Sequence, residues 1–197
     1  MGYLQEAFFF MKYLFLFLFG SLLLINCTNP ADTTTAHSYF DLKGFIEKQT
    51  TELNKRRPLV NKEMTLGDQN EKTQTNDIDW QRELELFNQA DLNKQAYQLS
   101  YTISQPNATT YLYVLKSGEN LPVKTLKIEV DEISKQPKLI EALMEEQNRL
   151  YDSEKRLQLT CTLRPEGVWL VKTYEISGFQ HLSITDRKTF SVKGTIN

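Results

Sequence analysis

Residues 97–130 read YQLSYTISQPNATTYLYVLKSGENLPVKTLKIEV, and this stretch decides the fold class. Three runs alternate in period two: the first holds Tyr97, Leu99, Tyr101 and Ile103, the second is centred on residues 111–115, and the third covers residues 126–130. Such alternation is typical of β-strands with one buried face. Pro106-Asn107 and Gly118-Glu119-Asn120 separate the runs and favour turns. The stretch therefore predicts the first strands of a β-meander.

The chain continues the same pattern towards its end. Residues 156–163, 168–177 and 188–196 are further strand candidates, so the sequence predicts six or more antiparallel strands. Residues 138–148 leave two interpretations open, because their apolar residues fit both helical and strand spacing. We favour a strand there, since a continuous meander needs no crossover.

Helical spacing precedes the sheet. Leu42, Phe45, Ile46 and Leu53 predict a helix over about residues 39–55, with a capping box at Ser38–Asp41 and a stop at Arg57-Pro58. Residues 60–75, with Gly67-Asp68 in the middle, suggest a short hairpin or a strand followed by a loop.

A second helical stretch follows the hairpin. Trp80, Leu84 and Phe87 fall on one face with Ala90 beside it, and Asp79 is a suitable N-cap. At its end, Asn93 can take the left-handed conformation and Lys94 suits the negative end of the helix dipole. The fold class is therefore α+β, with N-terminal helices packed on a curved antiparallel β-meander, in a single domain over residues 38–197.

The first 26 residues predict a secretory signal peptide. Lys12 precedes an apolar run from Tyr13 to Ile25, which is short for a membrane span. Met11 is our preferred start. With Met1 as the start, the longer apolar stretch makes an uncleaved anchor the alternative.

Cys27 directly follows the apolar run, in a segment that resembles the lipobox of bacterial lipoproteins. Asn26 departs from that pattern, which usually has Gly, Ala or Ser at this position. We expect Cys27 to carry the lipid and residues 27–37 to form a flexible tether, so that the protein is anchored rather than membrane-spanning.

Candidate chemical groups are few and have structural explanations. Cys161 alternates with Leu157, Leu159 and Leu163, which predicts a buried strand residue rather than a nucleophile. His37 lies in the tether and His181 in a turn or strand start, and neither has a partner at metal-ligand spacing. The acidic residues Asp77, Asp79, Glu83 and Glu85 are interpreted as a solvated cap and helix face rather than a metal site.

Composition excludes some partners. The net charge of -2 gives no excess of positive charge for nucleic acid. No signature of a nucleophile elbow, zinc protease, C-x-x-C motif or phosphate loop occurs in the sequence, so we expect no cofactor or metal and favour a non-enzymatic role.

Five segments together resemble a family of uncharacterised Bacteroidetes lipoproteins with a signal peptide and an α+β domain. They are residues 80–87, 90–94, Tyr101, 148–153 and 174–178. The resemblance implies no activity that can be carried over to particular residues. Surface lipoproteins of that group often carry an acidic run after the lipidated cysteine, whereas here only Asp32 occurs nearby. The resemblance thus implies an outer-membrane anchor facing the periplasm.

Three function classes are consistent with the sequence. An interaction or structural module of the cell envelope ranks first, with an envelope protein as partner. A periplasmic binding protein for an apolar or lipid-like ligand in the concave face of the sheet is the alternative. An enzyme with a site dispersed over several strands ranks third.

Overall fold

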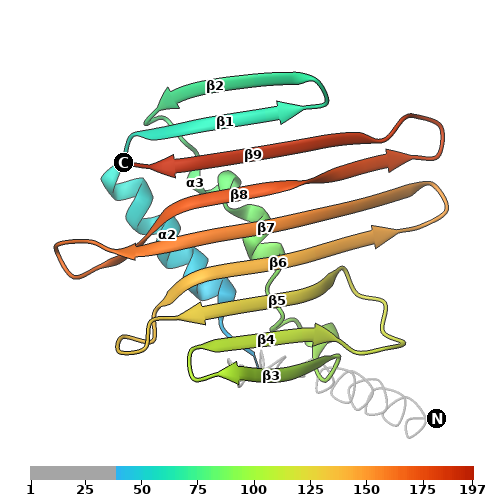
Figure 1. Ribbon diagram of the computed structural model, residues 1–197, viewed down its shortest axis with the longest axis horizontal. Coiled ribbons are helices and arrows are strands. Elements are labelled where there is room, and N and C mark those ends of the chain that lie inside the picture. The colour runs from blue at the N-terminus through green and yellow to red at the C-terminus, as the bar shows by residue number, and fades with distance from the viewer. Residues whose placement is uncertain (1–38) are drawn as a thin grey trace, which may run out of the picture. The chain divides into compact units, whose positions relative to one another are not determined.

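The computed structural model describes residues 39–197 and places the alternating runs in one antiparallel sheet of nine strands (Figure 1). The predicted signal peptide, Cys27, the tether and His37 lie outside the described residues. The strands are β1 (Val60–Leu66), β2 (Gln69–Thr75), β3 (Tyr101–Asn107), β4 (Thr110–Leu115), β5 (Val123–Val130), β6 (Pro137–Gln147), β7 (Tyr151–Leu163), β8 (Trp169–Leu182) and β9 (Lys188–Ile196). The prediction of a meander of six or more strands is confirmed, and so is the strand at residues 138–148.

The strand order is β2-β1-β9-β8-β7-β6-β5-β4-β3. From β3 to β9, each strand pairs with the next one along the chain, as a meander requires. The hairpin of β1 and β2 joins this meander at β9, where Val60 pairs with Ile196 and Leu66 with Phe190. Period two alone does not specify this long-range pairing. The sheet is open, with β2 and β3 as its edges.

Four helical segments occur in the described chain: α2 (Leu42–Arg56), α3 (Trp80–Glu83), α4 (Glu85–Gln89) and the 3₁₀ turn η2 (Gln95–Tyr97). Figure 1 shows α2 and α3 on one face of the sheet, whereas no helix covers the other face within residues 39–197. The predicted α+β class is confirmed as an antiparallel sheet with a few helices. The helices are few, and only α2 precedes the sheet, because α3 and α4 lie between β2 and β3.

The helix ends follow local chemistry, with two corrections. The first helix begins later than predicted, because the side chain of Asp41 accepts a hydrogen bond from Gly44 N and acts as the N-cap. It ends at Arg56, and Arg57 takes the left-handed conformation before Pro58. Asp79 caps α3 as predicted, through Arg82 N.

Asn93 does not take the predicted left-handed conformation. Its side chain instead accepts a hydrogen bond from Tyr39 N and donates to the carbonyl oxygen of Phe40 (2.9 Å). This residue therefore holds the start of the first helical segment. Lys94 donates to the carbonyl oxygen of Gln89, as expected for a cation at the end of a helix.

One strand prediction is wrong in detail, and one strand pairing contains an irregularity. The first run begins as the turn η2, and Leu99, with φ 66°, is exposed, so strand β3 starts only at Tyr101. A register shift between Thr160 and Cys161 interrupts the pairing of β7 with β8. The extra residue lies on β8, so the alternation of β7 continues through the buried Leu159 and Cys161, and Leu163 is exposed only as the last residue of the strand.

The core lies between the helices and one face of the sheet. It joins side chains of α2, α3 and α4 with the inward residues of the strands. Its largest fully buried members are Trp80, Tyr174, Phe87, Leu42, Ile46, Leu53, Leu84, Leu92, Leu126, Ile128, Ile140 and Leu157. The predicted buried stripe of Trp80, Leu84, Phe87 and Ala90 is thus confirmed.

Candidate functional site

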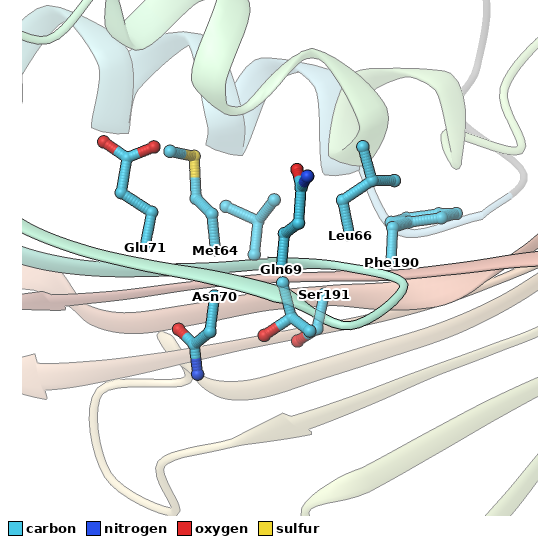
Figure 2. A pocket seen from close by; sticks show the side chains of 9 residues that line it. Met64, Leu66, Gln69, Asn70, Glu71, Phe190 and Ser191 are labelled. Atoms are coloured by element: carbon cyan, nitrogen blue, oxygen red, sulfur yellow. The ribbon is translucent and has the colours of Figure 1, made fainter.

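An open apolar groove lies where β1, β2 and β9 meet, on the face that carries the helices. Antiparallel register pairs Met64 with Val192 and Leu66 with Phe190, so these four side chains form its floor. The groove has a volume of about 600 Å³. Figure 2 shows Met64, Leu66 and Phe190 pointing towards the helix side of the sheet.

The groove continues the core face of the sheet beyond the helices. Val192 pairs with the buried Ile176, and both Val192 and Phe190 pack against the core. Phe190 pairs with Gly178, which has no side chain to fill the space beside the ring. Leu66, at the outer end, is 58% exposed. The floor therefore passes from buried core to solvent within a few residues.

Polar residues of β2 form the rim of the groove. Gln69 pairs with Leu66 and Glu71 with Met64, and both point to the same side as the floor (Figure 2). Asn70 and Ser191 point to the opposite side. An apolar floor with a polar rim is the usual composition of a binding surface.

A partly buried ion pair stabilises the sheet next to the groove. Glu83 of α3 accepts a hydrogen bond from Lys62 Nζ (2.7 Å) through one carboxylate oxygen and from the hydroxyl of Tyr174 (2.6 Å) through the other. Burial, and then the adjacent Glu83, raise the pKa of Tyr174 above its ordinary value. The ring of Trp80 packs edge-on against that of Tyr174. The three polar groups satisfy one another, so this cluster links α3 to β1 and β8 rather than presenting a reactive group.

The helix-free face has a different chemistry. One row of paired residues crosses the whole sheet on this face, and its members run, from β2 to β3, Lys72, Glu63, Lys193, Glu175, Gln158, Glu141, Lys127, Leu112 and Ser104. Lys72 bonds Glu63 (2.9 Å), and Lys127 bonds Glu141 (3.1 Å). Opposite charges on adjacent strands stabilise a hydrated sheet surface. Leu112 is the one apolar member of this row.

A second hollow, of about 740 Å³, lies between α2 and the turns that follow β5 and β7. Its apolar residues include Phe45 and Trp169, but Lys48, Glu52 and Asp131 also line it. These charges would have to be desolvated by an apolar ligand, which is costly. The groove at β1, β2 and β9 is therefore the better candidate.

The candidate residues predicted from sequence are not brought together. Cys161, the one cysteine in the described chain, is buried in β7, and burial raises the pKa of its thiol to about 12. His181 is not in a turn or at a strand start, as predicted, but is the second-last residue of β8 and is half-buried. Asp77, Asp79 and Glu85 are exposed as predicted, whereas Glu83 is not a solvated residue of that helix face, because it bonds Lys62 and Tyr174.

Sequence reasoning missed the groove itself. Met64 and Leu66 were recognised as strand residues, but their neighbours Phe190 and Val192 come from a segment far along the chain. One signal in the sequence could have indicated it. The hairpin at residues 60–75 has apolar residues, Met64 and Leu66, on one face, and no predicted helix was assigned to cover them.

Within residues 39–197, no three His, Cys, Asp or Glu side chains are grouped in a way that could hold a metal ion. None of the helices in this range has the length and apolar character needed to cross a membrane. Comparison of the chain with family models, with curated proteins and with solved structures finds no match.

Proposed function

We propose that this protein is a lipid-anchored interaction module of the cell envelope, and that it binds an extended segment of a partner protein along β2. The apolar groove carries this proposal, together with β2, whose outer edge pairs with no other strand of residues 39–197. Cys27 would hold the module at the outer membrane, facing the periplasm.

The two edges of the sheet differ in their suitability for strand addition. Strand β3 contains Pro106 and a register shift, both of which hinder pairing with another chain. Strand β2 has the sequence QNEKTQT, without Pro, and pairs with β1 in continuous register. An added strand would gain main-chain hydrogen bonds from the free side of β2.

The groove would supply the specificity. Alternate side chains of an added strand would lie beside Gln69 and Glu71 and extend over the floor formed by Met64, Leu66 and Phe190. A partner segment with apolar residues at every second position fits this arrangement.

Peptides selected from a random phage-displayed library on the purified full-length protein test this proposal. We expect enrichment of sequences with alternating apolar residues. Leu66→Asp should weaken their binding by roughly 10- to 100-fold, because one buried leucine contributes about 1.5–3 kcal/mol.

Leu163→Asp is the matched control, since Leu163 is 53% exposed but lies at the end of β7, away from the groove. Equal loss of binding in both variants, or selected peptides without alternation, would contradict strand addition at β2.

The anchor has its own test. Cells grown with a labelled fatty acid should incorporate the label into the parent protein, and Cys27→Ser should abolish it, because the apolar run ends directly at Cys27. Unchanged labelling in Cys27→Ser would remove the lipid anchor from the proposal.

The apolar floor also favours a second candidate, a binding protein for a small apolar or lipid-like ligand on the concave face of the sheet. A groove of about 600 Å³ has the size of a small-molecule site. Native mass spectrometry of the purified full-length protein would show a co-purifying lipid, lost in Leu66→Asp, if this second function is correct.

A further inference from the structure

Four exposed apolar side chains lie at one end of the sheet. Leu99 lies two residues before β3, Leu150 lies in the turn between β6 and β7, Leu182 ends β8, and Ile184 lies in the turn before β9. These positions are at the end of the sheet where β7 and β9 begin, on the right of Figure 1. We refer to these four residues as the loop edge.

Hydrogen bonds hold two of the turns together. Ser183 donates its N–H to the carbonyl oxygen of Leu150 (3.1 Å) and its hydroxyl to that of Arg149 (3.0 Å). Thr185 N donates to the carbonyl oxygen of Leu182. Leu150 and Ile184 are therefore presented by one connected pair of turns.

Leu99 is an unusual residue for its conformation. Its φ of 66° is unfavourable for a leucine, and its side chain is 83% exposed. No packing within residues 39–197 accounts for a leucine here, where Gly or Asn would fit the backbone with less strain. An external apolar contact would account for it.

In the two connected turns that present Leu150 and Ile184, basic residues outnumber acidic ones, although Glu146 and Asp152 lie on the adjoining strands. The two connected turns and the first residue of β9 carry Arg149, Arg187 and Lys188 against one carboxylate, Asp186. At the other end of the sheet, Ile133 is equally exposed, in a turn that carries Asp131 and Glu132 against Lys135. Basic residues beside apolar ones favour contact with anionic lipid head groups.

We propose that the loop edge contacts the surface of the phospholipid bilayer, so that the domain is seated on the membrane by this end. The inference rests on the proposed lipid anchor at Cys27. It adds an orientation, in which the apolar tips of the turns enter the head-group region.

The point at which the chain enters the domain agrees with this orientation. The ring of Tyr39 contacts Tyr101, and its hydroxyl donates to the carbonyl oxygen of Tyr97, at the beginning of β3. Leu99 lies between these two tyrosines in the sequence. Cys27 precedes Tyr39 by about 12 residues, which span roughly 40 Å at most. An anchored domain is therefore confined near the bilayer, where a weak interfacial contact is sufficient for binding.

Single-cysteine labelling of the full chain tests the seating. Leu150→Cys and Ile184→Cys introduce reactive thiols at the loop edge, and Ile133→Cys, from a residue 94% exposed compared with 91% for Ile184, is the matched control. Cys161 is buried and its thiol has a raised pKa, so an environment-sensitive fluorophore would label the new cysteine selectively.

The labelled full-length proteins would be reconstituted into vesicles of phosphatidylethanolamine and phosphatidylglycerol and first tested by flotation. We expect the probes at residues 150 and 184 to emit at shorter wavelength and to be quenched by lipids with doxyl groups on their acyl chains. The probe at residue 133 should remain in a watery environment.

The outcomes separate the two proposals. If the protein fails to float with the vesicles, the lipid anchor is wrong, and the seating fails with it. If the protein floats but the probe at residue 184 behaves like the probe at residue 133, the anchor stands and the seating is wrong. Shielding of residue 184 only after a protein partner is added would likewise overturn the membrane contact.

Discussion

At the scale of single residues, the close approach of Gly194 to Tyr174 constrains the sequence. They are paired across β8 and β9, and the tyrosine is fully buried. A Cβ atom at position 194 would lie 2.1 Å from the ring carbon Cζ of Tyr174. The ring cannot move freely, because its hydroxyl is bonded to Glu83. Glycine at this position makes room for the aromatic ring.

Gly194→Ala should therefore lower the free energy of unfolding by about 1–3 kcal/mol, the usual cost of overpacking a core. Urea denaturation followed by tryptophan fluorescence would measure it. Ser191→Ala, on the same strand but facing the other side, is the control and should change stability little. An unchanged urea midpoint for Gly194→Ala would mean that the ring of Tyr174 can move to accommodate the added methyl group.

At the scale of elements, α3 and α4 depend on the contacts they make. They have four and five residues and are separated at Leu84. Helices of this length are not stable alone in water, because nucleation outweighs the few hydrogen bonds gained. Trp80 and Phe87 bury them against the core, and Glu83 connects α3 to Lys62 and Tyr174.

Glu83→Gln should weaken this connection. The amide keeps the shape of the side chain but leaves Lys62 without a counter-ion, so we expect a loss of about 1–3 kcal/mol in unfolding free energy. Thermal and urea unfolding would measure it. Glu85→Gln, an exposed neighbour on the next turn, should be close to neutral. Equal effects in both variants would show that the ion pair contributes nothing particular.

Phe87→Ala tests whether the helical stripe belongs to the core. The side chain is fully buried, so its removal should cost about 3–5 kcal/mol, a large part of the stability of a typical domain. The variant should unfold at a clearly lower temperature or express poorly. A variant that melted like the parent while losing binding to the selected peptides would identify the stripe as an interaction surface instead.

At the scale of the whole molecule, one open sheet covered by helices on a single face holds several buried tyrosines. Burial raises the pKa values of Tyr101, Tyr113 and Tyr174 above their ordinary value of 10.0. Tyr101 and Tyr113 lie on β3 and β4, at one edge of the sheet, whereas Tyr174 lies on β8, closer to the opposite edge. Because they are buried in different parts of the sheet, their ionisation affects the stability of the whole domain.

Stability should fall above pH 10. In the unfolded chain these tyrosines lose their protons near pH 10, whereas in the folded protein they stay protonated, so above pH 10 the unfolded state binds fewer protons. Each tyrosine then lowers the free energy of unfolding by up to about 1.4 kcal/mol per pH unit, while below pH 10 its contribution is constant. Urea unfolding between pH 8 and about pH 11 would measure the slope.

Tyr174→Phe provides the comparison for this slope. It should lower stability below pH 10, because Glu83 loses a donor, and it should make the decline above pH 10 shallower. An identical slope in the parent and in Tyr174→Phe would show that this tyrosine does not contribute to the alkaline loss.

The sequence by itself determined the strands, most turns and the buried helical stripe. Each of these depends on local period, as in Leu126, Ile128 and Val130, or on local chemistry, as at Asp79 and Gly67. It mispredicted Leu99, because a left-handed backbone breaks the period without a local sign, and it did not show that Leu163 would be exposed at the end of its strand.

Only the tertiary structure decided which strands lie beside one another across long separations. The pairing of β1 with β9 brings Met64 and Leu66 to Phe190 and Val192 and thereby creates the groove. It also turned Glu83, which local pattern placed on a solvated helix face, into the partner of Lys62 and Tyr174. The physical reason is the same in both cases: burial depends on the neighbours that the whole fold provides, and neither the period nor the composition of a segment specifies them.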